Sequence, residues 1–171
     1  MILERRLGDK LTLIRSRRFL SYNRSIFFRH CAVIGLGGNI GNVLRRFERL
    51  HLFLNRDPRI QVLEMAPVLK NPPFGYMDQD DFLNSIMTVS TSMSPNEILR
   101  FLLHTEKRFG RKRSFANAPR TLDLDILFFD DLKMDRPHLK IPHPQWCERE
   151  SVLVPMSFMR TVRTGRRYQY A

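Results

Sequence analysis

The sequence predicts an α+β domain in which two helices cover one face of an antiparallel sheet. Short apolar runs typical of strands alternate with two segments of helical periodicity, in the order strand, helix, strand, strand, helix, strand. Two split β-α-β units in this order form a ferredoxin-like sandwich. The 171 residues are enough to bury such a core without disulfides or a structural metal. We therefore expect one β-α-β-β-α-β domain, with extra C-terminal elements that cover the sheet or its edge.

The first half of this domain is predicted to contain a strand, a helix and a second strand. Residues 31–37 are apolar and lead into G-G-N-I-G at 37–41. We interpret these glycines as a tight turn and not as a dinucleotide-binding fingerprint, because no acidic residue follows a second strand at the required offset. Apolar residues then recur at helical spacing, at Val43, Phe47, Leu50 and Leu54. Residues 60–69 are expected to form a strand that Ala66-Pro67 disturbs.

The second half begins with a long loop and continues with a strand, a helix and a last strand. Residues 70–81 are rich in Pro, Gly and Asp, which predicts the loop, and residues 82–91 follow with the period of a strand. Ser94-Pro95-Asn96-Glu97 has the spacing of a capping box and predicts a helix that Gly110 ends. The β-branched and aromatic run from Ile126 to Phe129 is typical of a buried strand.

A pair of carboxylates stands at the start of the last predicted strand. Side chains on a strand alternate between faces, so Asp123 and Asp125 would emerge on the same side, about 6.6 Å apart at Cα. Arg120 precedes them, and Arg111-Lys112-Arg113 lies just upstream. A bare D-x-D is often two exposed acids on an edge strand, but carboxylates beside arginines suit a phosphate held between metal ions and guanidinium groups. We therefore expect a phosphate site here.

The positive charge lies mostly at the two ends of the chain. The formal net charge is +12, of which residues 1–30 contribute +6, residues 160–171 contribute +4 and residues 31–159 only +2. A nearly balanced centre with basic ends is typical of a small-molecule enzyme with tails, and not of a domain with a nucleic-acid-binding face. We thus expect a basic extension, one domain and a basic tail over these three ranges. An organelle transit peptide is less favoured than a plain extension or a few extra strand residues, because Glu4 and Asp9 count against it.

The cysteines and the hydropathy favour a cytoplasmic protein. Cys31 and Cys147 belong to no C-x-x-C or Cys/His cluster, so we expect free thiols in a reducing compartment. No stretch is long and apolar enough to span a membrane, and the N-terminus lacks the features of a secretory signal. We expect a monomer with no membrane or nucleic-acid partner.

Several motifs coincide in this chain: G-G-N-I-G at 37–41, N-P-P-F-G at 71–75, D-F-L-N at 81–84, A-P-R-T-L-D-L-D-I-L at 118–127, and I-P-H-P with E-R-E-S-V-L between 141 and 153. Together they resemble 6-hydroxymethyl-7,8-dihydropterin pyrophosphokinase, a family of folate-pathway enzymes. The resemblance spans about residues 31–159. It implies a ferredoxin-like α+β fold and transfer of the terminal diphosphate of ATP to the hydroxymethyl group of the pterin, with release of AMP.

The resemblance also implies roles for individual residues. Asp123 and Asp125 would bind two Mg²⁺ ions that bridge the phosphates of ATP, which suits an in-line attack that needs charge neutralised on both sides. Arg111 and Arg120 match catalytic arginines that act on the triphosphate. Further contacts with ATP are implied for Leu99, Glu106, Arg113, Ile126, His143 and Arg149. Pterin contacts are implied for Asn71, Pro72, Phe74, Phe82 and Asn84.

Four positions depart from the family's pattern. Gly38 replaces a common Ser, and Asn71 replaces a common Thr. Asn117 stands at the place of an aromatic residue, for which Phe115 is a candidate substitute. Ser151 stands where many members have a Phe that stacks on the pterin, so one wall of the pterin site has no assigned residue.

Two other functions share parts of this pattern. An RNA-recognition domain has the same order of elements, but it needs exposed aromatic residues on its two central strands, and here residues 31–37 have none while Phe82 stands alone. A nucleotidyltransferase would also use an aspartate pair with two metals. The products separate the two enzymes, because nucleotidyl transfer releases pyrophosphate and diphosphate transfer releases AMP.

Overall fold

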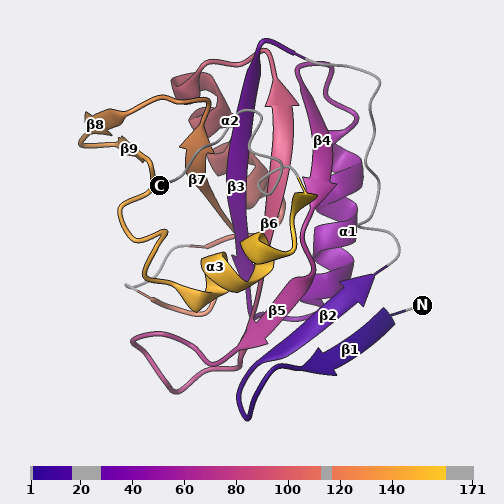
Figure 1. Ribbon diagram of the computed structural model, residues 1–171. Coiled ribbons are helices and arrows are strands. Elements are labelled where there is room, and N and C mark those ends of the chain that lie inside the picture. The colour runs from indigo at the N-terminus through magenta and orange to yellow at the C-terminus, as the bar shows by residue number, and fades with distance from the viewer. Residues whose placement is uncertain (1, 17–27, 113–116, 161–171) are drawn as a thin grey trace.

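The computed structural model describes residues 2–16, 28–112 and 117–160 (Figure 1). Its elements in chain order are β1 (Ile2–Arg6), β2 (Thr12–Ser16), β3 (His30–Gly38), α1 (Val43–Leu54), β4 (Ile60–Met65), β5 (Val68–Asn71), β6 (Phe82–Thr91), α2 (Pro95–Arg108), β7 (Asp123–Phe129), β8 (Met134–Arg136), β9 (Leu139–Ile141) and α3 (Glu150–Ser157).

The predicted β-α-β-β-α-β core is present. Strands β4, β6, β3 and β7 lie side by side in this order, and each neighbouring pair is antiparallel. The helices α1 and α2 follow the first and third strands of this core along the chain, as in two split β-α-β units. The predicted ferredoxin-like α+β fold is therefore confirmed.

Helices cover both faces of the sheet. The apolar side chains of α1 and α2, such as Phe47 and Leu102, share one core cluster with Ile34 of β3. On the other face, Val152 and Met156 of α3 belong to a second cluster. Figure 1 shows α3 in front of the sheet and the other two helices behind it. The C-terminal elements thus cover the sheet, as the sequence predicts.

One segment pairs with β6 in two pieces. β4 pairs with the second half of β6 and β5 with the first half, and Ala66-Pro67 separates them. Proline has no N–H to donate to a ladder, but Ala66 keeps the segment attached, because its N–H donates to the carbonyl of Ile86 at 2.8 Å. The expected strand with a disturbance at this dipeptide is confirmed.

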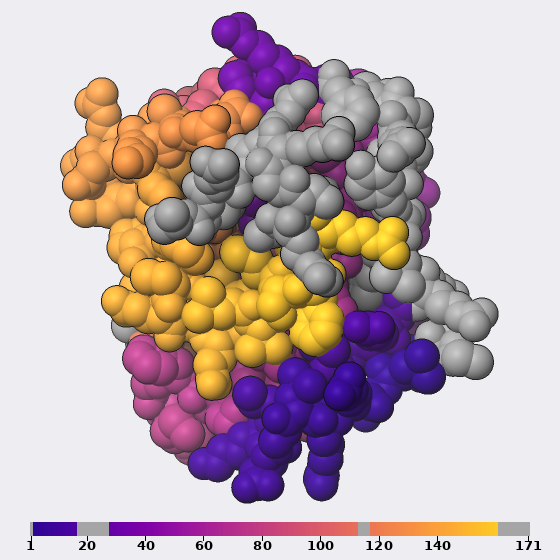
Figure 2. Space-filling model, viewed as in Figure 1, coloured from indigo at the N-terminus to yellow at the C-terminus, as the bar shows by residue number. Residues whose placement is uncertain are grey.

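A hairpin near the N-terminus widens the sheet, whereas the sequence analysis expected a plain extension or a few extra strand residues. β1 pairs with β2, and β2 pairs with β5. Leu13 and Ile14 of β2 are buried, with 2 % and 4 % exposure, whereas every residue of β1 is exposed. Figure 2 shows this hairpin, in indigo, at the lower end of the molecule below α3. Residues 1–30 therefore include one strand, β2, that contributes to the core.

Among the described residues, no helix is both long enough and apolar enough to cross a membrane.

We predict that the hairpin stabilises the fold through Ile14. Ile14→Ala removes a side chain that packs in the main core cluster, so it should lower the free energy of unfolding by about 2–4 kcal/mol in urea denaturation. The matched control is Ile2→Ala on the neighbouring strand, where the side chain is 52 % exposed and the change should stay within about 0.5 kcal/mol. Equal unfolding midpoints for the two variants would contradict the prediction.

Candidate active site

Two glycines on β3 form the floor of the candidate site. Gly37 lies opposite Asn84 of β6 on one side and Asp123 of β7 on the other. Gly35 lies opposite Asp125 of β7 in the same way. Paired residues on neighbouring strands face the same side of a sheet. The polar side chains of β6 and β7 therefore flank a strip of β3 backbone, at Gly35 and Gly37, that carries no side chains. We call this strip the glycine lane.

The lane leaves room for the flanking side chains. A Cβ atom on Gly37 would lie 2.9 Å from Oδ1 of Asn84, which is too close for an undisturbed amide. A small pocket with a cavity volume of about 60 Å³ lies over the lane. Its polar lining consists of Asn84, Ser85, Asp123, Asp125, His143, Arg149 and Ser151.

Two arginines neutralise Asp123. Nη1 of Arg111 contacts Oδ1 of Asp123, and Nη1 of Arg120 donates to Oδ2 at 2.5 Å. Arg111 also donates to Oε1 of Glu106 at 2.6 Å. Burial lowers the pKa of Arg111, but the charges of Asp123 and Glu106 outweigh this effect and raise it. The structure therefore brings together both predicted catalytic arginines and the first aspartate.

Asp125 has less compensation than Asp123. Burial raises the pKa of its carboxyl above the usual range, and the charge of Asp123 raises it further, while His143 and Arg149 partly oppose the rise. Among the described residues, none donates a hydrogen bond to the Asp125 carboxylate. The same residues contain no group of three or more His, Cys, Asp or Glu side chains arranged around one point. A cation site at the aspartate pair therefore stays a prediction, which rests on these two carboxylates.

Glu106 joins α2 to the start of β7. Its side chain is 3 % exposed, and its Oε1 accepts from the N–H of Leu124 at 2.8 Å as well as from Arg111. Burial raises the pKa of Glu106 to about 7. Two other residues predicted to contact ATP are Leu99 and Ile126. They pack in or against the main core cluster on the opposite face of the sheet, so their side chains do not line the pocket.

The predicted pterin residues are only partly assembled. Nδ2 of Asn84 donates to Oδ1 of Asn71 at 2.7 Å, and Nδ2 of Asn71 donates to the carbonyl of Pro72 at 2.8 Å. Phe82 lies opposite Asn71 in the β5–β6 ladder, and the guanidinium of Arg120 lies over its ring, 5.3 Å from the centroid. Phe74 is 82 % exposed and does not reach the pocket.

The segment after β9 brings a histidine and an arginine to the pocket. The N–H of His143 donates to the carbonyl of Leu127 at 2.9 Å, which fixes this segment against β7. Burial lowers the pKa of His143, and the negative charge of Asp125 partly opposes this effect. Arg149 contacts Oε1 of Gln145. Arg113, also predicted to bind ATP, lies outside the described residues.

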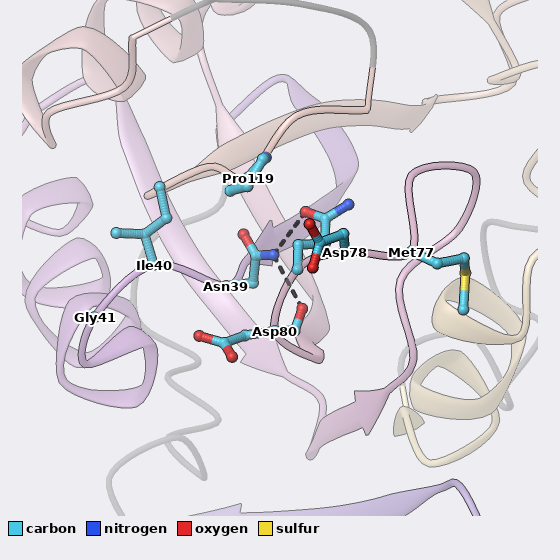
Figure 3. A pocket seen from close by; sticks show the side chains of 8 residues that line it. Asn39, Ile40, Gly41, Met77, Asp78, Asp80 and Pro119 are labelled. Carbon is cyan, nitrogen blue, oxygen red and sulfur yellow. Dashed lines mark hydrogen bonds between the residues drawn. The ribbon is translucent and has the colours of Figure 1, made fainter.

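The structure has a larger pocket that the sequence analysis did not predict, and Pro119 from the segment before β7 forms part of it (Figure 3). It has a cavity volume of about 540 Å³ and is lined by residues 39–41, residues 77–80 and Pro119. Asn39 and Gln79 of this lining were not singled out by the sequence analysis, nor was Gly35. The spacing of Gly35 and Gly37 on one strand could have predicted a strip of backbone without side chains. Asn39 and Gln79 are single amides in loops, and no local sequence pattern predicts their roles.

Known proteins resemble this chain over most of its length. The family described as 7,8-dihydro-6-hydroxymethylpterin-pyrophosphokinase matches residues 33–161. A 2-amino-4-hydroxy-6-hydroxymethyldihydropteridine pyrophosphokinase of Helicobacter pylori is 37 % identical over 151 residues, which covers 86 % of this chain and 93 % of that protein. The protein of the same name from Campylobacter jejuni is 38 % identical over 146 residues, with 85 % and 93 % coverage. One from Synechocystis is 41 % identical over 128 residues, with 75 % and 65 % coverage.

We predict that Glu106 makes stability depend on pH. Its folded pKa of about 7 lies above the ordinary value of 4.5, so its contribution is fully present below about pH 4.5 and is lost as the pH rises towards 7. Glu106→Gln keeps the shape but does not titrate. The free energy of unfolding of the variant minus that of the wild type should therefore increase by up to about 3 kcal/mol between pH 4 and pH 8. Urea denaturation at several pH values measures it, and a difference that stays constant would contradict the prediction.

Proposed function

We infer the activity of this chain from its family, because it belongs to the 7,8-dihydro-6-hydroxymethylpterin-pyrophosphokinase family. It is a transferase of folate biosynthesis that moves a diphosphate group from ATP to 6-hydroxymethyl-7,8-dihydropterin and gives AMP. We propose that the transfer takes place over the glycine lane of β3, between the carboxylates of β7 and the amides of β5 and β6.

One observation carries the placement of the phosphates. Asp125 is a half-buried carboxylate beside Asp123, and none of the described residues donates a hydrogen bond to it. A carboxylate in this position is costly unless a cation balances it. His143 and Arg149, which line the same pocket, supply polar and cationic groups where a chain of phosphates would continue.

The aspartate pair fits Mg²⁺. This ion is usually held by one or two carboxylates together with phosphate oxygens of the substrate and water. We propose that Asp123 and Asp125 hold two such ions. When bound, they would neutralise charge on both the attacking and the leaving oxygens of the in-line displacement.

We propose that the arginines exchange partners during the reaction. In the structure Arg111 and Arg120 form ion pairs with Asp123. When a cation balances this carboxylate, their guanidinium groups become free to bind the phosphates of ATP, to which they can donate in a bidentate manner. Arg113, Leu99, Glu106 and Ile126 remain proposed as further groups on the ATP side.

We propose that the pterin ring binds over Phe82, with its edge paired to Asn84 and Asn71. The two amides offer donors and acceptors that suit the nitrogen-rich edge of a pterin. Arg120 must leave the face of Phe82 to admit the ring. Pro72 and Phe74 belong to the loop before β6, so Phe74 takes part only after this loop moves over the pocket.

Two further parts of the proposal concern the whole protein. We propose that it acts as a monomer and that it is cytoplasmic, as its two free cysteines suggest.

The activity has a direct test. The protein incubated with ATP, Mg²⁺ and 6-hydroxymethyl-7,8-dihydropterin should form AMP and the pterin diphosphate in equal amounts, measured by chromatography. Without the pterin, AMP formation should fall to background. Release of pyrophosphate in place of AMP would instead indicate nucleotidyl transfer.

The role of the aspartate pair is tested by Asp125→Asn, which keeps the shape and removes the charge. We expect kcat to fall at least about a hundredfold, because a charge that neutralises the transition state is lost, while the thermal unfolding midpoint stays the same or rises. The matched control is Asp131→Asn, an exposed carboxylate just beyond the other end of β7. A variant at Asp125 as active as this control would contradict the proposed metal site.

A further inference from the structure

Asn39 connects three loops around the candidate site. It follows β3 and is only 7 % exposed. Its Oδ1 accepts from the N–H of Arg120 at 2.9 Å. Its Nδ2 donates to Oε1 of Gln79 at 2.8 Å and to the carbonyl of Asp80 at 3.0 Å. Both ends of one buried amide are thus satisfied by loops that come from distant parts of the chain.

Gln79 closes the connection from the opposite side. Its Nε2 donates to the carbonyl of Asn117 at 3.0 Å and to the carbonyl of Tyr76, within its own loop, at 2.6 Å. Figure 3 shows Asn39 between the loop of Asp78 and Asp80 and the segment of Pro119. The dashed lines are the two hydrogen bonds that its side chain donates. We call Asn39 and Gln79 the amide clasp. It ties the loop at 72–81 to the segment at 117–121.

The clasp holds the backbone of Arg120 on both sides. Besides donating its N–H to the Asn39 side chain, Arg120 accepts at its carbonyl from the N–H of Asn39 at 3.0 Å and of Ile40 at 3.3 Å. The side chain of Arg120 leaves this fixed point and reaches both Asp123 and the ring of Phe82. Where its guanidinium group lies therefore depends on where the clasp holds its Cα.

A second tie reaches only two of the three loops. Nη1 of Arg46 donates to the carbonyls of Ile40 and Thr121, at 2.8 and 3.0 Å. Arg46 thus holds the segment of Arg120 to the turn after β3 without contact to the loop at 72–81. The hydrogen bonds of Asn39 and Gln79 join the loop at 72–81 to both of the other loops.

We propose that Asn39 and Gln79 are positioning residues for the transfer: they hold Arg120 in register with the loop on the pterin side, so that its guanidinium group meets both substrates. This rests on the role proposed above for Arg120. Neither amide lines the pocket over the glycine lane, and both are hydrogen-bonded to the segment that carries Arg120. A displacement of about 1 Å in a group that contacts the reacting phosphates is enough to lower a rate by one or two orders of magnitude.

The test uses two variants that open the clasp from different sides. Gln79→Ala removes all its hydrogen bonds, and Asn39→Asp keeps the acceptor for the N–H of Arg120 while it loses the donor to Gln79. With both substrates saturating, each should lower kcat about tenfold and leave the KM for ATP within about twofold. The matched control is Asp78→Ala, a neighbour in the same loop and the same large pocket, which should keep kcat within twofold.

A combination with Arg120→Ala separates positioning from general destabilisation. If the amides act through Arg120, adding Gln79→Ala to Arg120→Ala should cause no further loss of kcat. A loss as large as in the wild-type background, or a kcat of Gln79→Ala equal to that of Asp78→Ala, would overturn the proposal. If Asn39→Asp fails to fold, Gln79→Ala alone decides. Wild-type kcat in Arg120→Ala would remove the proposed role of Arg120 itself, and the clasp proposal with it.

Discussion

The candidate site depends on the absence of side chains at two positions of the central strand. β3 lies between β6 and β7, so a side chain at Gly37 would point into the space between Asn84 and Asp123. A Cβ atom on Gly35, opposite Asp125, would contact the side chain of Leu127. At Gly37 even a methyl group would come within 2.9 Å of the Asn84 amide. The sheet can therefore carry recognition groups on one neighbour and charged groups on the other, with open backbone between them, and rigid strands hold all of these groups in register.

The charges of the site are divided between two kinds of structure. The carboxylates lie on β7 and on α2, where the ladders and the core hold them in place, while Arg111 and Arg120 lie in segments between elements. Asp123 is neutralised by these arginines, and Asp125, whose pKa burial raises, is not. The groups on the regular elements thus keep a negative charge that a cation can balance, and the two arginines lie outside the helices and strands.

The sequence predicted the parts of this arrangement that periodicity encodes. The six core elements, the shared face of Asp123 and Asp125 and the interruption at Ala66-Pro67 all follow from the spacing of residues within single segments. The hairpin was missed because Leu13 and Ile14 form a very short apolar run among basic residues, and they are buried only through pairing with β5. The role of Gly37 in the lane was missed for a related reason, since its neighbours come from other strands.

The contacts of the amide clasp are also not predictable from the spacing of residues within one segment. Asn39 meets Gln79 across 40 residues of sequence and Arg120 across 81, and no local pattern announces either contact. A lone Asn after a glycine pair has the composition of an ordinary turn. The structural role of Asn39 follows from its burial. An amide that is hidden from water must have its donors and acceptors satisfied, and here the partners belong to the two other loops.

Arg120 lies where all these constraints meet. Its backbone is held by Asn39, its guanidinium group pairs with Asp123, and its plane covers the ring of Phe82. Under the proposed function, a cation at the aspartates and a pterin at Phe82 each displace one of these two side-chain contacts. The cation would remove the pairing with Asp123, and the pterin would take the place of the guanidinium group over the ring of Phe82. Both ligands would therefore act on the position of one side chain, whose backbone Asn39 holds in place.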